Sequence, residues 1–165
     1  MTPRLSSETL IELFVAATAS PDAEICGLLL AGDGQIHARP ARNVASDPTR
    51  FFEIDPAALI AAHRAARGGE PAVIGHYHSH PRGDPDPSPT DAADAAPDGS
   101  LWLIVTRDRA RLWRAVPQGR VHGRFDAVAF DCIAGNRLAS GVRTVSLAPD
   151  IEPMRAEPWS LTFDD

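Results

Sequence analysis

The sequence predicts an α/β protein in which helices sandwich a mixed β-sheet. Three observations predict this class. A helical stretch with apolar residues at i, i+3, i+4 and i+7 lies near the N-terminus. Short apolar runs bounded by Gly, Pro and Asp follow it, as is typical of buried strands. The elements alternate in the order helix, strands, helix, strand, helix, strands, which favours two helical layers around one sheet.

The first predicted helix has Ser7 as its cap and ends before Pro21. Its apolar positions all fall on one face, which we expect to pack on the sheet: Leu10, Leu13, Phe14 and Ala17. Strands over residues 26–31 and 35–39 come next, joined by the turn Gly32-Asp33-Gly34. This segment therefore predicts a helix followed by a hairpin.

A polar loop over residues 43–50 leads into a predicted short strand at residues 51–54. Asp55 then supplies a cap and Pro56 the first position of a second helix, which we expect to run to about Arg67. The chain next enters a buried strand that begins with Ala72-Val73-Ile74-Gly75, followed by a segment rich in His, Pro and Asp.

Further strands are predicted at residues 101–106 and 110–116, with a tight turn between them, and at about residues 120–130. Residues 142–147 are apolar enough for one more strand. Residues 1–147 are therefore interpreted as one domain.

Residues 148–165 are interpreted as a C-terminal tail that is either extended or docked on a sheet edge. Trp159, Leu161 and Phe163 alternate as in a strand, whereas the prolines at 149, 153 and 158 favour an irregular chain. Docking, in the same molecule or on another copy, and disorder both remain open at this level.

Composition excludes several classes of function. The net charge of −6 and pI near 5.4 give no footprint for nucleic acid, so no nucleic-acid partner is expected. Cys26 and Cys132 form no Cys-x-x-Cys pair, which fits a reducing compartment and neither a disulfide framework nor a thiolate zinc site. No apolar run is long enough for a membrane span, and no signal-peptide core is present. We expect a cytoplasmic protein.

Two histidines at the end of the strand that begins at Ala72 form a partial metal site. His78 and His80 point to the same face because successive strand side chains alternate. Neutral imidazole suits zinc. His76 shares their parity, so spacing alone leaves three interpretations open for it: fourth ligand, hydrogen-bonding neighbour of a ligand, or simply buried residue. We favour a role other than ligand.

Ser88-Pro89-Thr90-Asp91 completes the candidate site. Taken alone, it predicts no more than a capped helix, with Ser88 as N-cap and Asp91 as the capping-box acid. Placed after His-x-His, the same turn returns an acid toward the strand end. His78, His80 and Asp91 would then supply three ligands and leave a fourth zinc position open, which is the catalytic arrangement.

The composite of these motifs resembles the signature of the JAMM/MPN+ metalloproteases. It consists of His78-Ser79-His80-Pro81, seven residues between His80 and Ser88, and two more before Asp91. The upstream stretch that begins with Glu24-Ile25-Cys26-Gly27-Leu28-Leu29 is similar to that of the prokaryotic members. The resemblance implies the MPN/JAB fold with its cytidine-deaminase-like layering, over roughly residues 5 to 130, and a catalytic domain in residues 1–147.

The resemblance also implies a function. Zn²⁺ would be held by His78, His80 and Asp91, with Glu24 as general base and Ser88 as donor to the oxyanion. The activity would be hydrolysis of the bond after the C-terminal glycine of a ubiquitin-like protein, with E1-like and E2-like enzymes as further partners. The loop 43–50 and the strand 51–54 are the candidate docking edge for that protein's C-terminus.

Two alternatives remain at this level. One is a non-catalytic MPN-type scaffold that binds a ubiquitin-like partner, and such scaffolds usually lack the ligands. The other is a ferrous oxygenase with two histidines and one carboxylate, which the order of the ligands and the upstream glutamate disfavour.

Overall fold

A computed structural model describes residues 2–134 and 159–160. In this part of the chain there are three helices and nine strands. The helices are α1 (Ser7–Ala19), α2 (Pro56–Arg67) and α3 (Pro89–Asp94). The strands are β1 (Arg4–Ser6), β2 (Cys26–Gly32), β3 (Gln35–Ala41), β4 (Ala72–Ser79), β5 (Leu101–Val105), β6 (Arg109–Gly119), β7 (Gly123–Val128), β8 (Asp131–Ile133) and β9 (Trp159–Ser160).

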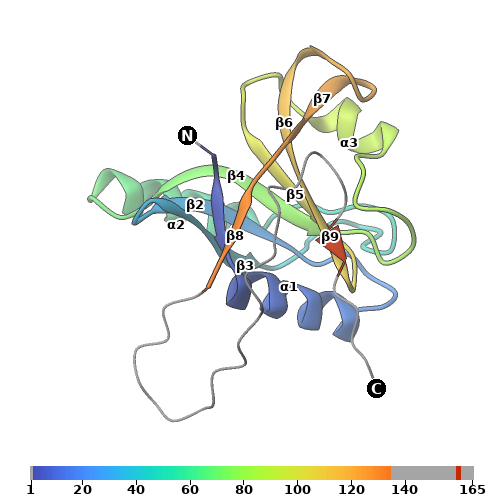
Figure 1. Ribbon diagram of the computed structural model, residues 1–165, viewed down its shortest axis with the longest axis horizontal. Coiled ribbons are helices and arrows are strands. Elements are labelled where there is room, and N and C mark those ends of the chain that lie inside the picture. The colour runs from blue at the N-terminus through green and yellow to red at the C-terminus, as the bar shows by residue number, and fades with distance from the viewer. Residues whose placement is uncertain (1, 135–158, 161–165) are drawn as a thin grey trace.

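The strands form one sheet in the order β7-β6-β5-β4-β2-β3-β1-β8, and β9 pairs with β6 (Figure 1). β4 runs parallel to β5, and β1 runs parallel to both β3 and β8, while the other pairs are antiparallel. The predicted mixed sheet is therefore confirmed. β4, the strand that carries the histidines, lies in the interior of the sheet between β2 and β5.

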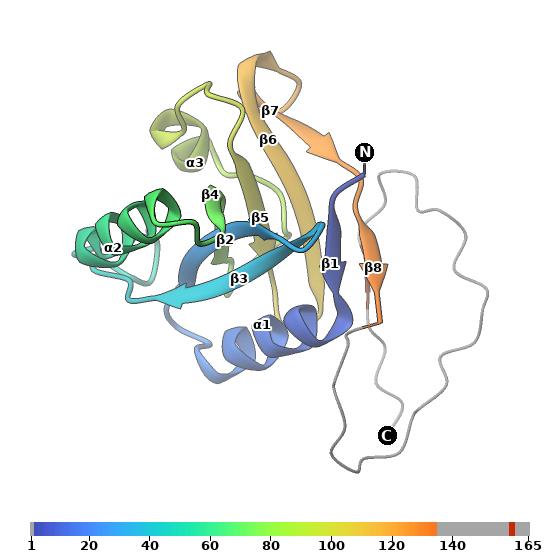
Figure 2. The same ribbon diagram turned by 90° about the vertical axis from the view of Figure 1, so that its left-hand side faces the viewer.

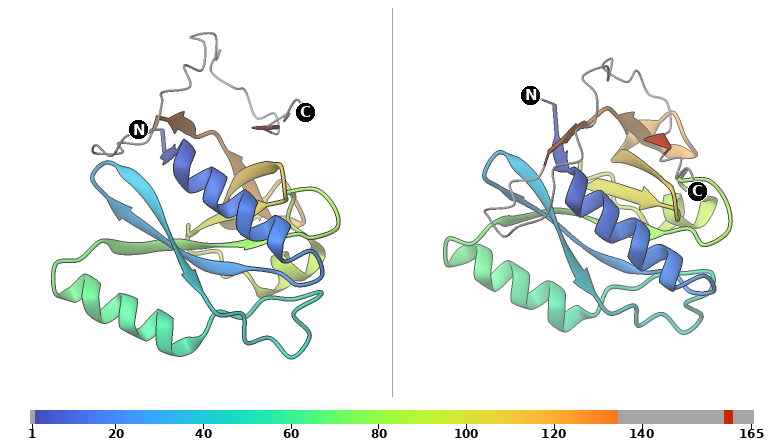
Figure 3. Two further views of the ribbon diagram at one scale, coloured as in Figure 1. Left: turned by 90° about the horizontal axis from the view of Figure 1, so that it is seen from below. Right: turned by 60° about the horizontal axis from the view of Figure 1, so that its bottom comes forward.

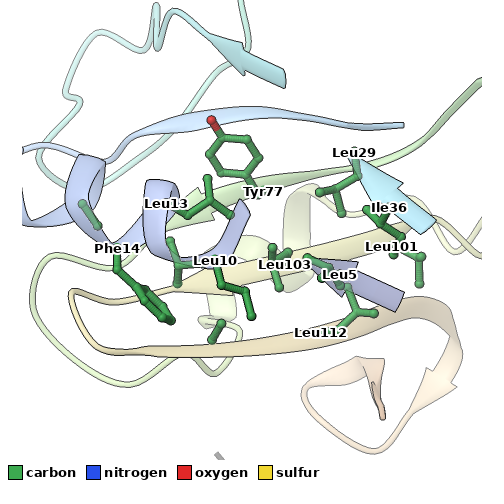
Figure 4. Packing of buried hydrophobic residues seen from close by; sticks show 13 residues of the cluster. Leu5, Leu10, Leu13, Phe14, Leu29, Ile36, Tyr77, Leu101, Leu103 and Leu112 are labelled. Carbon is green, nitrogen blue, oxygen red and sulfur yellow. The ribbon is translucent and has the colours of Figure 1, made fainter. Parts of the chain in front are cut away.

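Helices cover both faces of the curved sheet, with α1 on one face and α2 and α3 on the other (Figure 2). α1 lies across the strands (Figure 3) and packs its predicted apolar face onto them. The main core forms here, around side chains that include Leu10, Leu13, Leu103 and Leu112 (Figure 4). On the opposite face, α3 packs with the two tryptophans Trp102 and Trp113, and α2 covers Leu28 and Leu30.

The helix ends follow the expected capping chemistry with one correction. The N-cap of α1 is Ser6 rather than Ser7, because the Ser6 hydroxyl accepts the hydrogen bond from the Thr9 amide. Asp55 caps α2 through the Ala57 amide, and Pro56 occupies its first turn, as predicted. α3 ends at Asp94, inside the alanine run that follows Asp91.

The predicted strand at residues 51–54 is wrong. Ile54 makes only an isolated bridge with Asn43, and residues 51–53 belong to no strand. Two backbone hydrogen bonds flank this bridge, from Val44 N to the Glu53 carbonyl and from Asp55 N to the Arg42 carbonyl. The Asn43 side chain adds two more: its amide donates to the Phe51 carbonyl at 3.0 Å, and its oxygen accepts from Glu53 N at 3.0 Å. A side chain thus satisfies backbone groups that a longer strand pairing would have satisfied.

Two short strands, β1 between β3 and β8 and β8 at the edge, escaped prediction, because three residues carry too little periodicity. β1 and β8 pair with each other in parallel, so residues 4–6 lie beside residues 131–133. The strand predicted at residues 120–130 is real but shorter, as β7 spans only Gly123–Val128.

Part of the tail lies on the sheet. Trp159 and Ser160 pair antiparallel with Ala110 and Arg109 of β6, in line with the docking alternative for these two residues. The strand expected at residues 142–147, and the alternating positions Leu161 and Phe163, lie outside the described residues.

None of the described helices can cross a membrane. α1 is the longest of them with 13 residues, whereas a span requires about 20 apolar residues.

Candidate metal centre

The candidate site forms where β4 leaves the sheet. His78 is paired on both sides, with Cys26 of β2 and Ile104 of β5, and is fully buried. β4 ends at Ser79, and His80 N donates to the Val105 carbonyl, which keeps the backbone in line for one more residue. This continuity places both imidazoles on the same side, as the alternation of strand side chains predicted.

Three potential ligand atoms converge there. The Nε2 atoms of His78 and His80 lie 3.1 Å apart, and each lies 3.4 Å from a carboxylate oxygen of Asp91. A tetrahedral ion with bonds of 2.0–2.1 Å separates its ligand atoms by roughly 3.3 Å. The donor set and its spacing therefore fit a zinc-sized ion, and in the described residues these three side chains form the one group suited to hold a metal.

Asp91 is held by the first turn of α3. The Ser88 amide donates to Asp91 Oδ2 at 2.6 Å, and the Asp91 amide donates to Ser88 Oγ at 3.1 Å, which is a complete capping box. Burial alone would raise the pKa of the Asp91 carboxyl, but interactions with His78, His80 and Ser88 hold that pKa well below its usual range. The capping and ligand interpretations are thus compatible, and Asp91 faces the histidines as an anion.

The two histidines are oriented by different means. His80 is fixed by a hydrogen bond, since its Nδ1 lies 2.9 Å from the carbonyl of Asp84. His78 is fixed by packing: Phe52 stacks on its ring at 4.3 Å with an interplanar angle of 11°, and Trp102 meets it edge-on at 5.9 Å. His78 Nδ1 has no hydrogen-bond partner among the described residues. Burial lowers the pKa of His78, which favours the neutral form that a metal requires.

His76 does not join this group. Its ring packs against Trp102 with centroids 4.0 Å apart and against Phe52 at 5.3 Å. Burial lowers its pKa to about 3, so the ring is neutral near pH 7. This placement agrees with the expectation that His76 is a buried neighbour of the site rather than a ligand.

Glu24 reaches the same region through reciprocal hydrogen bonds between its neighbour and the motif strand. Ile25 N donates to Ser79 Oγ at 2.9 Å, and Ser79 N donates to the Ile25 carbonyl at 3.0 Å. The other side of Glu24 is tied down as well, because Asn43 Nδ2 donates to the Glu24 carbonyl at 2.9 Å. These contacts hold the backbone of Glu24 beside the end of β4.

A cleft of about 700 Å³ opens over the site. Glu24, His80 and Ser88 line it together, so three of the residues singled out in the sequence share one cavity. The remaining lining comes from three segments: Pro21 and Asp22, Thr49 to Phe51, and Pro81, Arg82 and Thr90. Residues 49–51 and residues 81–82 therefore line the same cleft as Glu24, His80 and Ser88.

The Glu24 carboxyl is poised to exchange a proton near neutral pH. Burial raises its pKa from 4.5 to about 7, the negative charge of Asp91 adds to the rise, and His80 opposes it. A carboxylate with a pKa close to the working pH can both accept and return a proton.

This raised pKa predicts a pH-dependent stability for the metal-free protein. Between pH 4.5 and 7 the unfolded chain ionises Glu24 while the folded chain keeps the proton, so the free energy of unfolding contributed by this group falls as pH rises. The Glu24→Gln variant has no carboxyl to ionise at this position, so it does not lose this stability as pH rises. In urea unfolding with chelator present, we expect the variant to gain stability over wild type from pH 5 to pH 8. A difference independent of pH would contradict the assigned burial of the charge.

Comparison with known proteins places the chain in a family. Residues 6–116 match the model described as prokaryotic homologs of the JAB domain. The chain belongs to this family. As a prokaryotic JAB-domain protein, it shares 38% identity over 96 residues with the desampylase of Haloferax volcanii, which is 56% of this chain and 68% of that one. The desampylase of Pyrococcus furiosus is 29% identical over 96 residues, covering 58% and 68% of the two chains.

Solved structures agree with the JAB fold. The solution structure of a Desulfitobacterium hafniense protein superposes with a TM-score of 0.65 at 22% identity, over 83% of this chain and 95% of that one. A JAB1/MPN domain protein from Archaeoglobus fulgidus superposes with a TM-score of 0.51 at 15% identity, over 80% and 98% of the two chains. The predicted MPN/JAB layering is therefore confirmed.

Several residues of this JAB-domain site were not found from the sequence. Phe52 stacks on His78, Asn43 holds Glu24, and the carbonyl of Asp84 orients His80. A backbone carbonyl has no sequence signature, and the sequence does not distinguish a loop aromatic residue that packs on a ligand from any other apolar residue. Ser79 did offer a signal. It lies between the two histidines and points to the opposite face of the strand, so its hydroxyl can form a hydrogen bond with a neighbouring segment but cannot reach the metal site.

Proposed function

We propose that this protein is a zinc-dependent isopeptidase that removes a ubiquitin-like protein from an amine. One observation carries the proposal: His78, His80 and Asp91 converge at ligand spacing, and Glu24 and Ser88 line the same cleft. The desampylase relatives support hydrolysis of this class.

In this proposal the three convergent side chains hold the ion. Zinc supplies Lewis acidity there, which polarises a carbonyl group and makes water more acidic. The chain's own residues provide the rest. The packing of Phe52 and Trp102 around His78 keeps one wall of the site dry, and the cleft leaves His80 with 13% of its side chain exposed.

Glu24 is proposed as the general base and acid. One of its carboxylate oxygens takes a proton from the attacking water and later delivers it to the leaving amine. Its pKa of about 7 suits both transfers. The hydrogen bonds of Ile25 and Asn43 limit the movement of this segment, which favours a carboxylate held in one position.

Ser88 is proposed as the donor to the developing oxyanion. Its Oγ accepts the hydrogen bond from the Asp91 amide, which leaves its own hydroxyl hydrogen unused within the capping box. That hydrogen can be donated into the cleft, a contribution of roughly 10²–10³-fold in rate.

The substrate's C-terminal segment is proposed to enter along the cleft, between residues 49–51 and residues 81–82. In this arrangement the loop 43–50 remains part of the docking edge. Residues 51–53 form no strand, so the substrate's backbone would have to pair with backbone groups of the loop. Arg50 and Arg82 line this cleft together with Asp22, which pairs with Arg82 at 3.3 Å, so its wall carries charges of both signs. E1-like and E2-like enzymes remain proposed partners, and the free thiols of Cys26 and Cys132 support action in the reducing cytoplasm.

The test is cleavage of a ubiquitin-like protein joined through its C-terminal glycine to a lysine side chain. We expect zinc-loaded protein to release the two products, a strong chelator to stop the reaction, and added zinc to restore it. Protein purified without added metal should contain zinc; iron without zinc would support an oxygenase instead. Tight binding of the conjugate with no hydrolysis would overturn the proposal in favour of a scaffold.

A further inference from the structure

The loop between the two halves of the metal motif is anchored on β6. Residues 81–87 connect His80 to Ser88, and the Asp84 carbonyl in this loop accepts the hydrogen bond from His80 Nδ1 at 2.9 Å. The position of this loop therefore decides whether His80 keeps its hydrogen-bond acceptor. Only a neutral ring with its proton on Nδ1 leaves a lone pair on Nε2, the atom that faces His78 and Asp91.

Three alternate residues of one β6 face contact three consecutive residues of the loop. Arg109 Nη2 pairs with Asp84 at 2.7 Å, and Arg111 pairs with Asp86. Pro85 lies between these two aspartates in the loop, and Trp113 Nε1 donates to its carbonyl at 2.9 Å. Residues 109, 111 and 113 share a face because strand side chains alternate.

Of these three contacts, the one made by Trp113 is buried. The Trp113 residue is 4% exposed, and Pro85 is among the fully buried side chains. The arginine pairs are more open, with 47% exposure for Asp86 and 67% for Asp84, and exposed ion pairs contribute little. A lost buried hydrogen bond, in contrast, leaves the Pro85 carbonyl unsatisfied.

We propose that Trp113 is a positioning residue for the metal centre, acting through the loop and not by contact with the ion. Its indole N–H fixes the Pro85 carbonyl, and the neighbouring Asp84 carbonyl is thereby presented to His80 Nδ1. The inference rests on the proposed function only in its choice of zinc as the ion. Loss of a group that orients a ligand typically weakens metal binding by 10–100-fold.

Trp113→Phe tests this, because phenylalanine keeps most of the ring and removes only the N–H donor. We expect zinc affinity, measured by competition with a chromogenic chelator, to fall about 10–100-fold. In metal-free protein, at a pH high enough for the His80 ring to be neutral, nitrogen-detected NMR should show its proton on Nδ1 in wild type, and a mixture of tautomers in the variant.

Arg114→Met is the matched control. Arg114 follows Trp113 on β6 and also donates to a backbone carbonyl, since its Nη1 lies 2.9 Å from the carbonyl oxygen of Gly99. That carbonyl lies outside the loop of residues 81–87. Loss of this donor should leave the His80 tautomer and zinc affinity near their wild-type values, even where thermal stability falls.

The outcomes separate this inference from the proposed function. Equal zinc affinities for Trp113→Phe and Arg114→Met would overturn the role of Trp113 and leave the isopeptidase proposal standing. A wild-type protein that binds no zinc would remove the proposed function, while the tautomer in metal-free protein would still decide the role of Trp113. Should Trp113→Phe fail to fold, a neutral wild-type His80 ring with its proton on Nε2 alone would be sufficient to refute the inference.

Discussion

Replacing Glu24 by glutamine is expected to lower the rate of isopeptide cleavage by about 10²–10⁴-fold, the usual contribution of a general base. Zinc content should stay at the wild-type level, because Glu24 is not one of the three convergent ligands. The amide is nearly isosteric with the carboxylate, and the backbone contacts of Ile25 and Asn43 do not involve the side chain that changes. The measurements are kcat on a ubiquitin-like conjugate and metal content by elemental analysis.

Glu70→Gln provides the control for this substitution. Glu70 is exposed in the turn after α2, where its backbone amide donates to the Ala65 carbonyl at 3.1 Å. The control should retain full activity. An active Glu24→Gln protein would mean that the base is misassigned. Because the same variant should stabilise the metal-free protein at high pH, loss of activity together with gained stability would be hard to explain by misfolding.

Replacing Asp91 by alanine is expected to abolish both zinc binding and cleavage. The variant leaves two imidazoles as the remaining ligands and removes the anion that faces them. It also breaks the capping box, at a cost of about 1 kcal/mol in the free energy of unfolding. Metal analysis, the cleavage assay and urea unfolding measure the three effects separately.

Two variants divide the roles of this turn. Asp94 lies in the same helix but is exposed, so Asp94→Ala should leave zinc binding intact. Ser88→Ala removes the other half of the capping box and the proposed oxyanion donor, so we expect it to retain zinc and lose activity. Zinc binding by Asp91→Ala at wild-type affinity would exclude Asp91 as a ligand.

The sequence was sufficient for much of the site because its information is local. His78 and His80 share a face by strand alternation, and Ser88 and Asp91 form a capping box by helix geometry, so residues a few positions apart fix each other's orientation. The helix caps Asp55 and Ser88 were readable for the same reason. The misplaced cap of α1 and the two missed short strands show the limit. Neighbouring serines are hard to tell apart as caps, and three-residue strands carry too little pattern to be recognised.

By itself, then, the sequence determined the fold class, the family and the residues from which a metal ligand set can be assembled. Only the tertiary structure decided how that set is held: β4 between β2 and β5, Ser79 on Ile25, Phe52 on His78, and Trp113 on the loop beside His80. The reason is physical. Side-chain direction within one strand or turn follows from backbone geometry. Contacts between segments 28 or 54 residues apart, such as Trp113 with Pro85 and Ile25 with Ser79, depend instead on how the whole sheet packs.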